Sequence, residues 1–223
     1  MSLSVSQATR VRRSKGEQTR LAILESTLEV IAGLGLKNVT HRAVAARAGV
    51  QLSLTTYYFR DIDDLLQQAF TLFCERSRPG YEELWSRVFE HLAPYSRSEL
   101  RRTDTRQSLV EALSAMALDY LMTQVRHRPT GLAVEQTLFS AVRHSAALAA
   151  LAEQHRGNLL GPLVRFCATF NKADPEIDAE LLLDSLMRLE HQALVNQPAR
   201  VEQERLLRLV RRQLGWVVGL QRA

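Results

Sequence analysis

Apolar residues recur at intervals of three and four along almost the whole chain, whereas the strict alternation of apolar and polar residues typical of strands is nearly absent. This pattern predicts an all-α protein. The first helix is expected at about residues 16–34, where glycines at positions 33 and 35 end the pattern. Its apolar stripe consists of Leu21, Ile23, Leu24, Thr27, Leu28 and Ile31.

Two short helices are expected next. The Thr40 hydroxyl can cap a helix over the alanine-rich residues 41–48, and Gly49 stops it. Val50 anchors the turn, and residues 52–59 form a second short helix. A short helix, a glycine turn and another short helix predict a helix-turn-helix motif.

Longer helices account for the rest of the pattern. Three aspartates, Asp61, Asp63 and Asp64, put negative charge at the start of a helix, where the helix dipole favours it, and the apolar stripe then continues toward Trp85 and Phe89. A polar, arginine-rich loop is expected at residues 94–105, and a stop at residues 196–198. The remaining helices are expected near residues 107–125, 132–144, 146–170, 177–195 and 206–218.

The length of 223 residues fits either one domain or a small module fused to a larger one. The placement of charge along the chain is more informative. Residues 1–60 contain nine Lys or Arg residues and three Glu residues, a net charge of +6. The whole chain carries +5, so residues 61–223 sum to −1. This asymmetry indicates a polyanion partner for the first part alone, although a merely solvated basic surface is the alternative.

One stretch is especially suited to a nucleic acid. Between Glu29 and Asp61 there is no carboxylate, which removes repulsion from a phosphate backbone. The second short helix contains the segment TTYY, whose β-branched and aromatic residues have low helix propensity. Thr and Tyr hydroxyls can donate to phosphate oxygens. We therefore expect this helix to be covered by double-stranded DNA.

Other classes of function find little support in the residues. The two cysteines, Cys74 and Cys167, stand apart in apolar helical patterns and are expected to be reduced and buried, without a zinc site. The N-terminus lacks the apolar stretch of an export signal, and no run reaches the roughly 18 apolar residues of a membrane span. A cytoplasmic protein without a membrane partner is expected. No catalytic motif or cofactor loop is recognisable, so no enzyme activity, metal or cofactor is predicted.

The stretch VTHRAVAARAGVQLSLTTYYFRDIDDLLQQAF resembles the DNA-binding region of the tetracycline-repressor (TetR) family of bacterial transcriptional regulators. The resemblance covers roughly residues 17–70 and rests on Thr40, Ala45, Ala48, Gly49, Val50, Tyr57, Tyr58, Phe59, Asp64, Leu65 and Leu66. It implies an N-terminal three-helix DNA-binding domain over residues 1–60, preceded by a basic arm. A long helix would join it to a C-terminal helical domain over residues 61–223 for effector binding and dimerisation.

The resemblance also implies roles for individual residues at the DNA. Arg42 could contact guanine O6 and N7, Thr40 and His41 would lie at a phosphate, and Thr55 and Phe59 would face inward. Leu52 and Leu54 could contact thymine methyl groups, but inward packing of one of them is the alternative. Many members have Lys in place of Ile62 and Tyr in place of Thr56, and Arg60 and Tyr58 could substitute. The expected DNA-binding residues are Arg20, Thr40, His41, Arg42, Leu52, Ser53, Leu54, Thr56, Tyr57, Tyr58 and Arg60.

The last two helices carry an argument about assembly. Apolar residues surround too much of residues 177–195 to be covered by one core face, which indicates a second neighbour, although an ordinary monomer core is the alternative. The resemblance implies that these helices form a homodimer interface. The residues expected in it are Leu182, Leu186, Leu189, Leu206, Val210, Leu214 and Val217.

The family plan further implies a repressor that binds a palindromic operator and is released by a small hydrophobic or amphipathic effector of unknown identity. A regulator that responds to a protein, or to nothing, is the alternative. The expected pocket residues are Trp85, Met116, Tyr120, Phe139, Arg143, Phe166, Phe170 and His191, each of which could instead be plain core packing.

Overall fold

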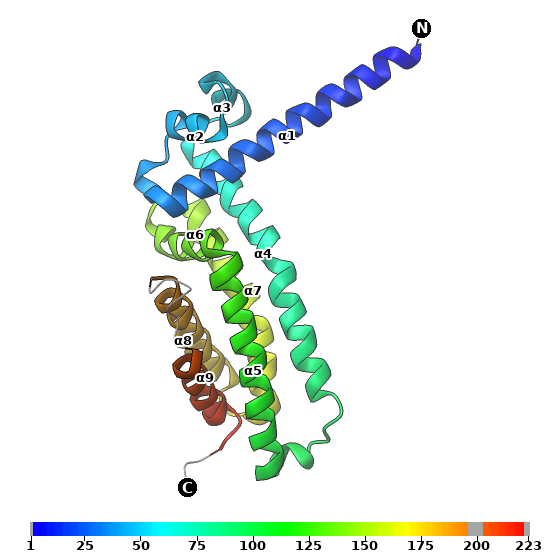
Figure 1. Ribbon diagram of the computed structural model, residues 1–223, viewed down its shortest axis with the longest axis vertical. Coiled ribbons are helices and arrows are strands. Elements are labelled where there is room, and N and C mark those ends of the chain that lie inside the picture. The colour runs from blue at the N-terminus through cyan, green and yellow to red at the C-terminus, as the bar shows by residue number, and fades with distance from the viewer. Residues whose placement is uncertain (1, 196–202, 221–223) are drawn as a thin grey trace. The chain divides into compact units, whose positions relative to one another are not determined.

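The computed structural model describes residues 2–195 and 203–220, and no strand occurs within these two ranges (Figure 1). The all-α prediction is confirmed. The helices are α1 (Ser2–Leu34), α2 (His41–Ala48), α3 (Leu52–Tyr58), α4 (Ile62–Leu92), α5 (Thr103–His127), α6 (Pro129–Ser140), α7 (Ala146–Phe170), α8 (Pro175–Val195) and α9 (Gln203–Val217). Three single 3-10 turns, η1 (Leu36–Asn38), η2 (Glu99–Arg101) and η3 (Ala141–Arg143), lie in the connections.

Several helix boundaries differ from the expected ones. The first helix begins at Ser2 rather than near residue 16, because no proline or early glycine interrupts the segment before it. The arginine-rich loop contains η2, which Leu100 anchors by its burial, and α5 begins already at Thr103. The predicted stop at residues 196–198 lies outside the described residues.

The chain folds as two compact units. The first runs up to Arg76 and includes Ala133–Ala152, and the second comprises Ser77–Leu132 and the residues from Glu153 onward. Helices α4, α6 and α7 therefore contribute to both. The two units are defined by compactness and not by function. The predicted boundary at residue 60, between a DNA-binding domain and an effector-binding domain, therefore stays a prediction.

The core of the first unit forms where α1, α2, α3 and the start of α4 meet the corner between α6 and α7. Its fully buried side chains include Ile23, Phe59, Phe70, Leu138 and Leu148. Leu21 of the expected stripe is instead 37% exposed. The corner is also held by a polar contact, because His144 Nε2 lies 3.1 Å from Asp63 Oδ1 at the start of α4.

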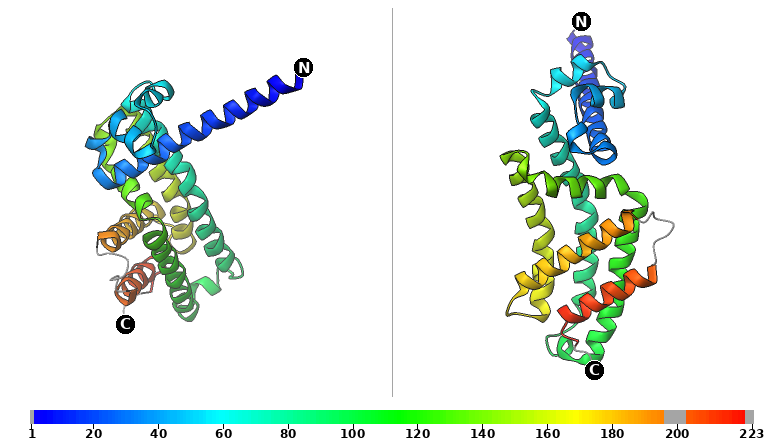
Figure 2. Two further views of the ribbon diagram at one scale, coloured as in Figure 1. Left: turned by 45° about the horizontal axis from the view of Figure 1, so that its top comes forward. Right: turned by 90° about the vertical axis from the view of Figure 1, so that its left-hand side faces the viewer.

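The second unit is a bundle formed by the end of α4 with α5, α7, α8 and α9, and α8 and α9 lie side by side in it (Figure 2). Its buried core includes Leu109, Val125, Phe166 and Val210. Burial raises the pKa of the Cys167 thiol to about 12, so this thiol stays protonated at neutral pH. Cys74 and Cys167 are both free thiols; Cys167 is buried as expected, whereas Cys74 is only half-buried.

Two further features concern partners. None of the described helices has the length and apolar character needed to cross a bilayer. Within residues 2–195 and 203–220, no group of three or more His, Cys, Asp or Glu side chains is placed to hold a metal ion.

Candidate nucleic-acid interface

Helix α2 begins and ends where local chemistry requires it. The Ala43 N–H donates to Thr40 Oγ1 at 3.1 Å, so Thr40 caps the helix as predicted. Gly49 has a φ of 64°, a left-handed conformation that costs glycine nothing, and the Val50 N–H donates back to the Ala45 carbonyl at 3.0 Å. The turn between α2 and α3 is therefore set by the sequence itself.

One face of α3 is fixed inward. Phe59 and Thr55 are fully buried, and the Thr55 hydroxyl donates to the Leu52 carbonyl at 2.7 Å. Leu54 is half-buried and packs on the core of the first unit. Tyr58 is also half-buried, and a methyl group placed on Gly16 of α1 would lie 3.4 Å from its hydroxyl oxygen. Leu54 and Tyr58 thus hold α3 against the core of the first unit.

The opposite face of α3 is open. Tyr57 is 78% exposed and Leu52 is 44% exposed, with Ser53 and Thr56 exposed between them. The structure thus separates the two leucines whose orientation was open, because Leu52 faces outward and Leu54 packs inward. An exposed leucine and tyrosine beside two hydroxyls form a surface with apolar and hydrogen-bonding groups but no carboxylate.

The basic residues near this face differ in how they are held. Arg42 at the second position of α2 is exposed, and it makes no ion pair or hydrogen bond with any described residue. Arg47 donates to Glu29 at 2.5 Å. Arg20 bonds the side chain of Gln68, and its guanidinium lies 5.9 Å from the centre of the Phe59 ring. Arg42 is therefore the predicted cation with the most freedom to meet a ligand.

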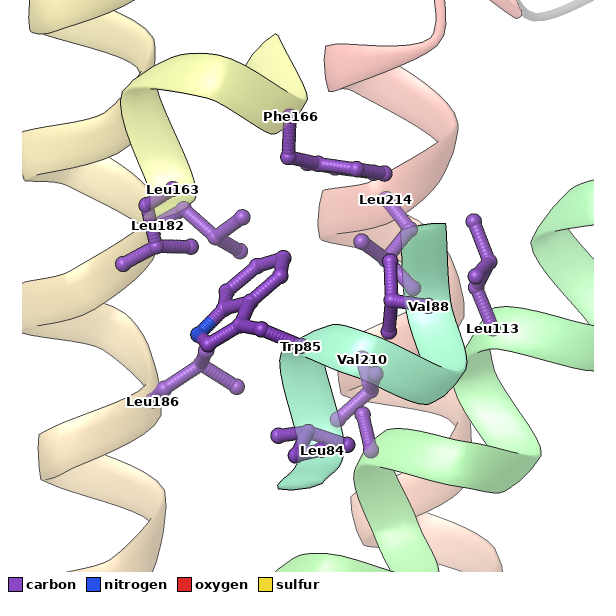
Figure 3. A pocket seen from close by; sticks show the side chains of 11 residues that line it. Leu84, Trp85, Val88, Leu113, Leu163, Phe166, Leu182, Leu186, Val210 and Leu214 are labelled. Atoms are coloured by element: carbon purple, nitrogen blue, oxygen red, sulfur yellow. The ribbon is translucent and has the colours of Figure 1, made fainter. Parts of the chain in front are cut away.

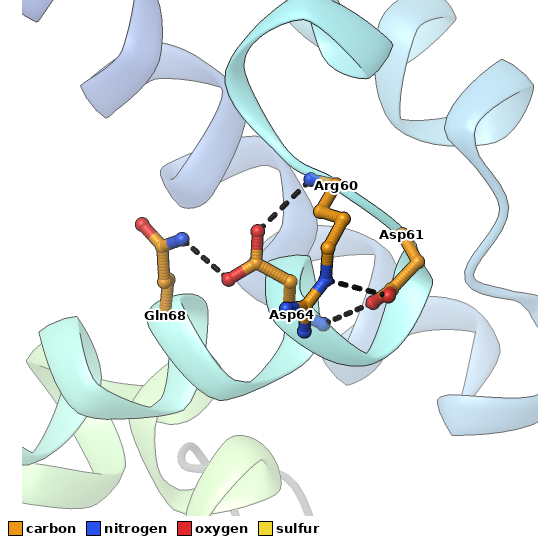
Figure 4. A network of polar contacts seen from close by, with 4 residues as sticks. All are labelled: Arg60, Asp61, Asp64 and Gln68. Atoms are coloured by element: carbon orange, nitrogen blue, oxygen red, sulfur yellow. Dashed lines mark hydrogen bonds and ion pairs between the residues drawn. The ribbon is translucent and has the colours of Figure 1, made fainter.

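A polar network joins α3 to α4 (Figure 4). Asp61 Oδ1 accepts the Asp64 N–H at 2.8 Å and so caps α4, while Asp64 Oδ2 accepts the Arg60 N–H at 2.9 Å. The Arg60 guanidinium lies 3.0 Å from Asp61 Oδ2, and Gln68 donates to Asp64 at 2.7 Å. These contacts hold the end of α3 at a fixed angle to α4.

The same contacts set the charge state of this junction. The hydrogen bond from the Asp64 backbone lowers the pKa of Asp61, with the Arg60 guanidinium adding to the effect. Conversely, the hydrogen bond and charge of Asp61 raise the pKa of Arg60. Arg60 was expected at the DNA, but in this structure much of its charge is balanced by Asp61. The positioning roles of Asp61, Asp64 and Gln68 were missed, although an acidic residue three positions after another at a helix start indicates a cap.

The two remaining expected DNA residues lie at the start of α2. Thr40 is exposed beside its capping bond. His41 is half-buried, and its Nδ1 is enclosed without a hydrogen-bond partner among the described residues.

The second unit contains an apolar cavity of about 60 Å³ (Figure 3). Of the expected pocket residues, it brings together Trp85 and Phe166, whose ring centres are 6.0 Å apart. Met116 and Phe170 pack on the core of this unit without lining the cavity. Tyr120 is half-buried and His191 exposed. Phe139 and Arg143 belong to the first unit.

The expected dimer residues have an unexpected environment. Leu182, Leu186, Val210 and Leu214 line the cavity, and Leu189 and Leu206 are buried within the same unit. Val217 is half-buried. The apolar side chains that α8 and α9 expose form a different set, namely Ile177, Leu181, Val195, Leu209 and Trp216. An interface on these helices stays a prediction, but in this protomer the exposed set is the surface available for it.

Comparison with known proteins agrees with this geometry. Residues 23–69 match the family model described as bacterial regulatory proteins, tetR family. No protein of curated function matches the chain.

Three solved structures illustrate the likeness of the fold. A transcriptional regulator from Rhodococcus sp. RHA1 is 20% identical, with 90% of this chain and 96% of that chain covered and a TM-score of 0.64. A tetR-family member from Streptomyces coelicolor A3 is 24% identical, with 87% and 97% covered and a TM-score of 0.57. The multidrug binding protein EbrR, complexed with imidazole, is 23% identical, with 88% and 89% covered and a TM-score of 0.53.

The matched residues 23–69 include all of α2 and α3, so the family model falls on the helix-turn-helix with the open face described above. This segment of the chain is therefore similar to bacterial regulatory proteins of the tetR family, and the chain shares its fold with solved transcriptional regulators.

Proposed function

We propose that this protein is a transcriptional repressor that binds a palindromic operator as a homodimer and releases it when a small molecule binds. It would act in the cytoplasm, where a bacterial chromosome lies. The observation that carries the proposal is the open face of α3 beside the unpartnered Arg42, on a motif whose inner face is locked.

In this proposal α3 lies in the major groove. The exposed Leu52 would contact thymine methyl groups, and the hydroxyls of Ser53, Thr56 and Tyr57 would bond bases or phosphates. Arg42 would read a guanine or bind a phosphate, and Thr40 would lie at the phosphate near the start of α2. Tyr58, Leu54 and Arg20 would act mainly by holding α3 in place.

The homodimer would use the outer face of α8 and α9. Leu181 and Trp216 are 67% and 65% exposed, and large apolar side chains left open in a protomer commonly mark an interface. A twofold axis would place two α3 helices on successive major grooves, about 34–36 Å apart. A palindromic operator follows from that symmetry.

The release step is supported by the cavity in the second unit. The multidrug binding protein EbrR, which has a similar fold, has been solved in complex with imidazole. For the present chain, a ligand must bind the operator-bound and released states with different affinity in order to act. A regulator without a small-molecule effector is the alternative, and the cavity favours the first.

Selection of bound duplexes from random double-stranded DNA tests the proposal. We expect a palindrome whose half-site centres are about 10 base pairs, or a multiple of that, apart. The affinity for the selected duplex should fall steeply as salt rises, because phosphate contacts release counterions. Failure to bind any duplex at low ionic strength would reject the proposal.

A further inference from the structure

Exposed side chains form a single stripe along α8. In the right-hand view of Figure 2, α8 and α9 lie in front of the other helices of the second unit, so one side of α8 is uncovered. The residues of the stripe are exposed and follow one another at intervals of four and three positions in turn. They are Ile177, Leu181, Asp184, Arg188, His191 and Val195. At this average spacing of 3.5 residues, two packed helices stay in contact along their length.

The stripe changes in chemistry from its ends to its middle. Its ends are apolar, and Ile177, Leu181 and Val195 are each more than half exposed. Its middle is charged, because the acidic Asp184 lies about one turn before the basic Arg188. A wholly apolar stripe would accept many apolar helices, whereas opposite charges restrict both the partner and the register.

The two charges of the stripe differ in how their own protomer holds them. Arg188 makes no ion pair or hydrogen bond with any residue in the described part of the chain. Asp184 Oδ1 lies 3.2 Å from the guanidinium of Arg156 on α7, but the Asp184 side chain is still 63% exposed. A carboxylate has two oxygens and about four acceptor sites, so Asp184 can accept a second partner.

A twofold axis perpendicular to α8 would lay this helix antiparallel to its own copy. In such a pairing, any contact between two positions occurs twice, once in each direction. An axis between Leu181 and Asp184 sets these two residues opposite each other, so a carboxylate meets a leucine. An axis between Arg188 and His191 sets Asp184 opposite an apolar residue. Both registers desolvate a charge without an opposite charge to meet it.

A third register removes this conflict. An axis between Asp184 and Arg188 places Asp184 opposite the partner's Arg188, and Arg188 opposite the partner's Asp184. The apolar ends of the stripe then meet each other, Ile177 with the partner's Val195. Of the three registers, this one alone pairs opposite charges in the middle and apolar residues at the ends.

We propose that α8 pairs with α8 of a second copy in this third register, and that two reciprocal ion pairs between Asp184 and the partner's Arg188 select an identical chain as partner. Leu181 then packs on the ring of the partner's His191. The inference rests on the proposed homodimer and deepens it, because it states which partner helix the surface accepts. A helix with an apolar or like-charged residue at either central position would leave a charge without a partner, which disfavours that pairing.

Variants that change the two charges test the register directly. Asp184→Arg alone sets two arginines opposite each other at both contacts, and Arg188→Asp alone sets two aspartates there. We expect each variant to be monomeric in sedimentation where the parent is dimeric, with the dissociation constant raised at least about tenfold. The double variant, which combines both changes, restores opposite charges and should be dimeric.

A mixture of the two single variants provides the sharpest readout. One copy of Asp184→Arg and one copy of Arg188→Asp present opposite charges at both contacts. Mixing the two monomeric variants should therefore give dimers that contain one copy of each. Native mass spectrometry distinguishes these dimers, because the two variants differ in mass.

Two controls separate the register from total charge and from the fold. Glu176→Arg makes the same change of charge at an exposed position of α8 outside the stripe, and it should stay dimeric. Arg156→Gln removes the contact of Asp184 within the protomer, and it should also stay dimeric. If Asp184→Arg does not fold, Arg188→Asp carries the test, because Arg188 bonds no described residue.

The possible outcomes separate this proposal from the broader one. A dimer that persists in a folded Asp184→Arg or Arg188→Asp variant would overturn the register while the proposed homodimer stands. A mixture of the two single variants that stays monomeric would also overturn it. If the parent is monomeric at micromolar concentration and binds no palindromic duplex, the proposed function fails, and the pairing of α8 fails with it.

Discussion

The outer face of α3 and the outer faces of α8 and α9 are both left uncovered by their own unit, but they differ in chemistry. The face of α3 offers Leu52 and Tyr57 beside hydroxyls, with no carboxylate. The faces of α8 and α9 offer larger apolar groups, such as Leu181 and Trp216, between charges of both signs. The first surface suits a polyanion with methyl groups in its groove, and the second suits a protein surface.

The inner sides of the same helices differ as well. Thr55 of α3 and Phe59 directly after it are buried in a closed core, whereas the inner faces of α8 and α9 line a cavity. The inner face of α3 therefore packs on a filled core. The α8 and α9 pair has a proposed ligand on one side and a proposed partner copy on the other, so changes at these helices should separate the two roles.

The largest expected effect distinguishes those two sides. Val210→Glu buries a charge without a partner and should reduce the free energy of unfolding by roughly 3–5 kcal/mol. Leu181→Glu changes an exposed position, so the protomer should stay folded while sedimentation shows monomers. A folded monomer from Val210→Glu, or a dimer that persists in Leu181→Glu, would reverse the assignment of the two faces.

The next effect concerns Arg42 in α2. Arg42→Ala should weaken operator binding by about 1–3 kcal/mol without changing the melting temperature, because its side chain is exposed and bonds no described residue. Arg47→Ala is the matched control, since Arg47 is already bound to Glu29. An equal loss in both variants would indicate a general charge effect rather than a contact made by Arg42.

How well each region could be predicted depends on how far apart in the sequence its interacting residues lie. Thr40 and Gly49 act on residues within five positions of themselves, so the start and end of α2 could be predicted from the sequence. The burial of Thr55 and Phe59 could be predicted as well, but only through the resemblance to a family. The start of α1 was misjudged because the helix continues through Gly16 toward Ser2.

The pair of α8 and α9 shows what the pattern of apolar residues cannot predict. The repeat of leucines identifies apolar positions, but a helix that is apolar on several sides gives no sign of which side meets the core. Leu182 and Val210 were expected between protomers and lie within one. The cavity could not be predicted either, because a void depends on how side chains from five helices meet rather than on any of them alone.

A smaller effect tests the cap of α2. Thr40→Ala removes the acceptor for the Ala43 N–H and should cost about 1 kcal/mol of stability. Thr40→Ser retains the hydroxyl and is the control, which should unfold close to the wild type in urea. Because the first unit carries α3, operator affinity should fall with stability in Thr40→Ala. Unchanged urea midpoints in both variants would mean that the cap contributes little.

The smallest expected effect concerns the junction between α3 and α4. The pKa of Asp61 is lowered in the folded protein by the Asp64 backbone hydrogen bond and by Arg60, so the charged carboxylate favours the folded state above the ordinary aspartate pKa of about 3.9. This contribution is lost as pH falls through the lower, folded-state pKa. The melting temperature of Asp61→Asn should therefore lie slightly below that of the wild type at pH 6, and the gap should close as pH falls below about 4.

The same change removes a negative charge beside Arg60, so operator binding at low salt should become slightly tighter. A gap that stays constant down to pH 2 would show that the Asp61 charge does not stabilise this junction, and weaker operator binding would show that the cap matters more to α3 than the charge it places near the DNA.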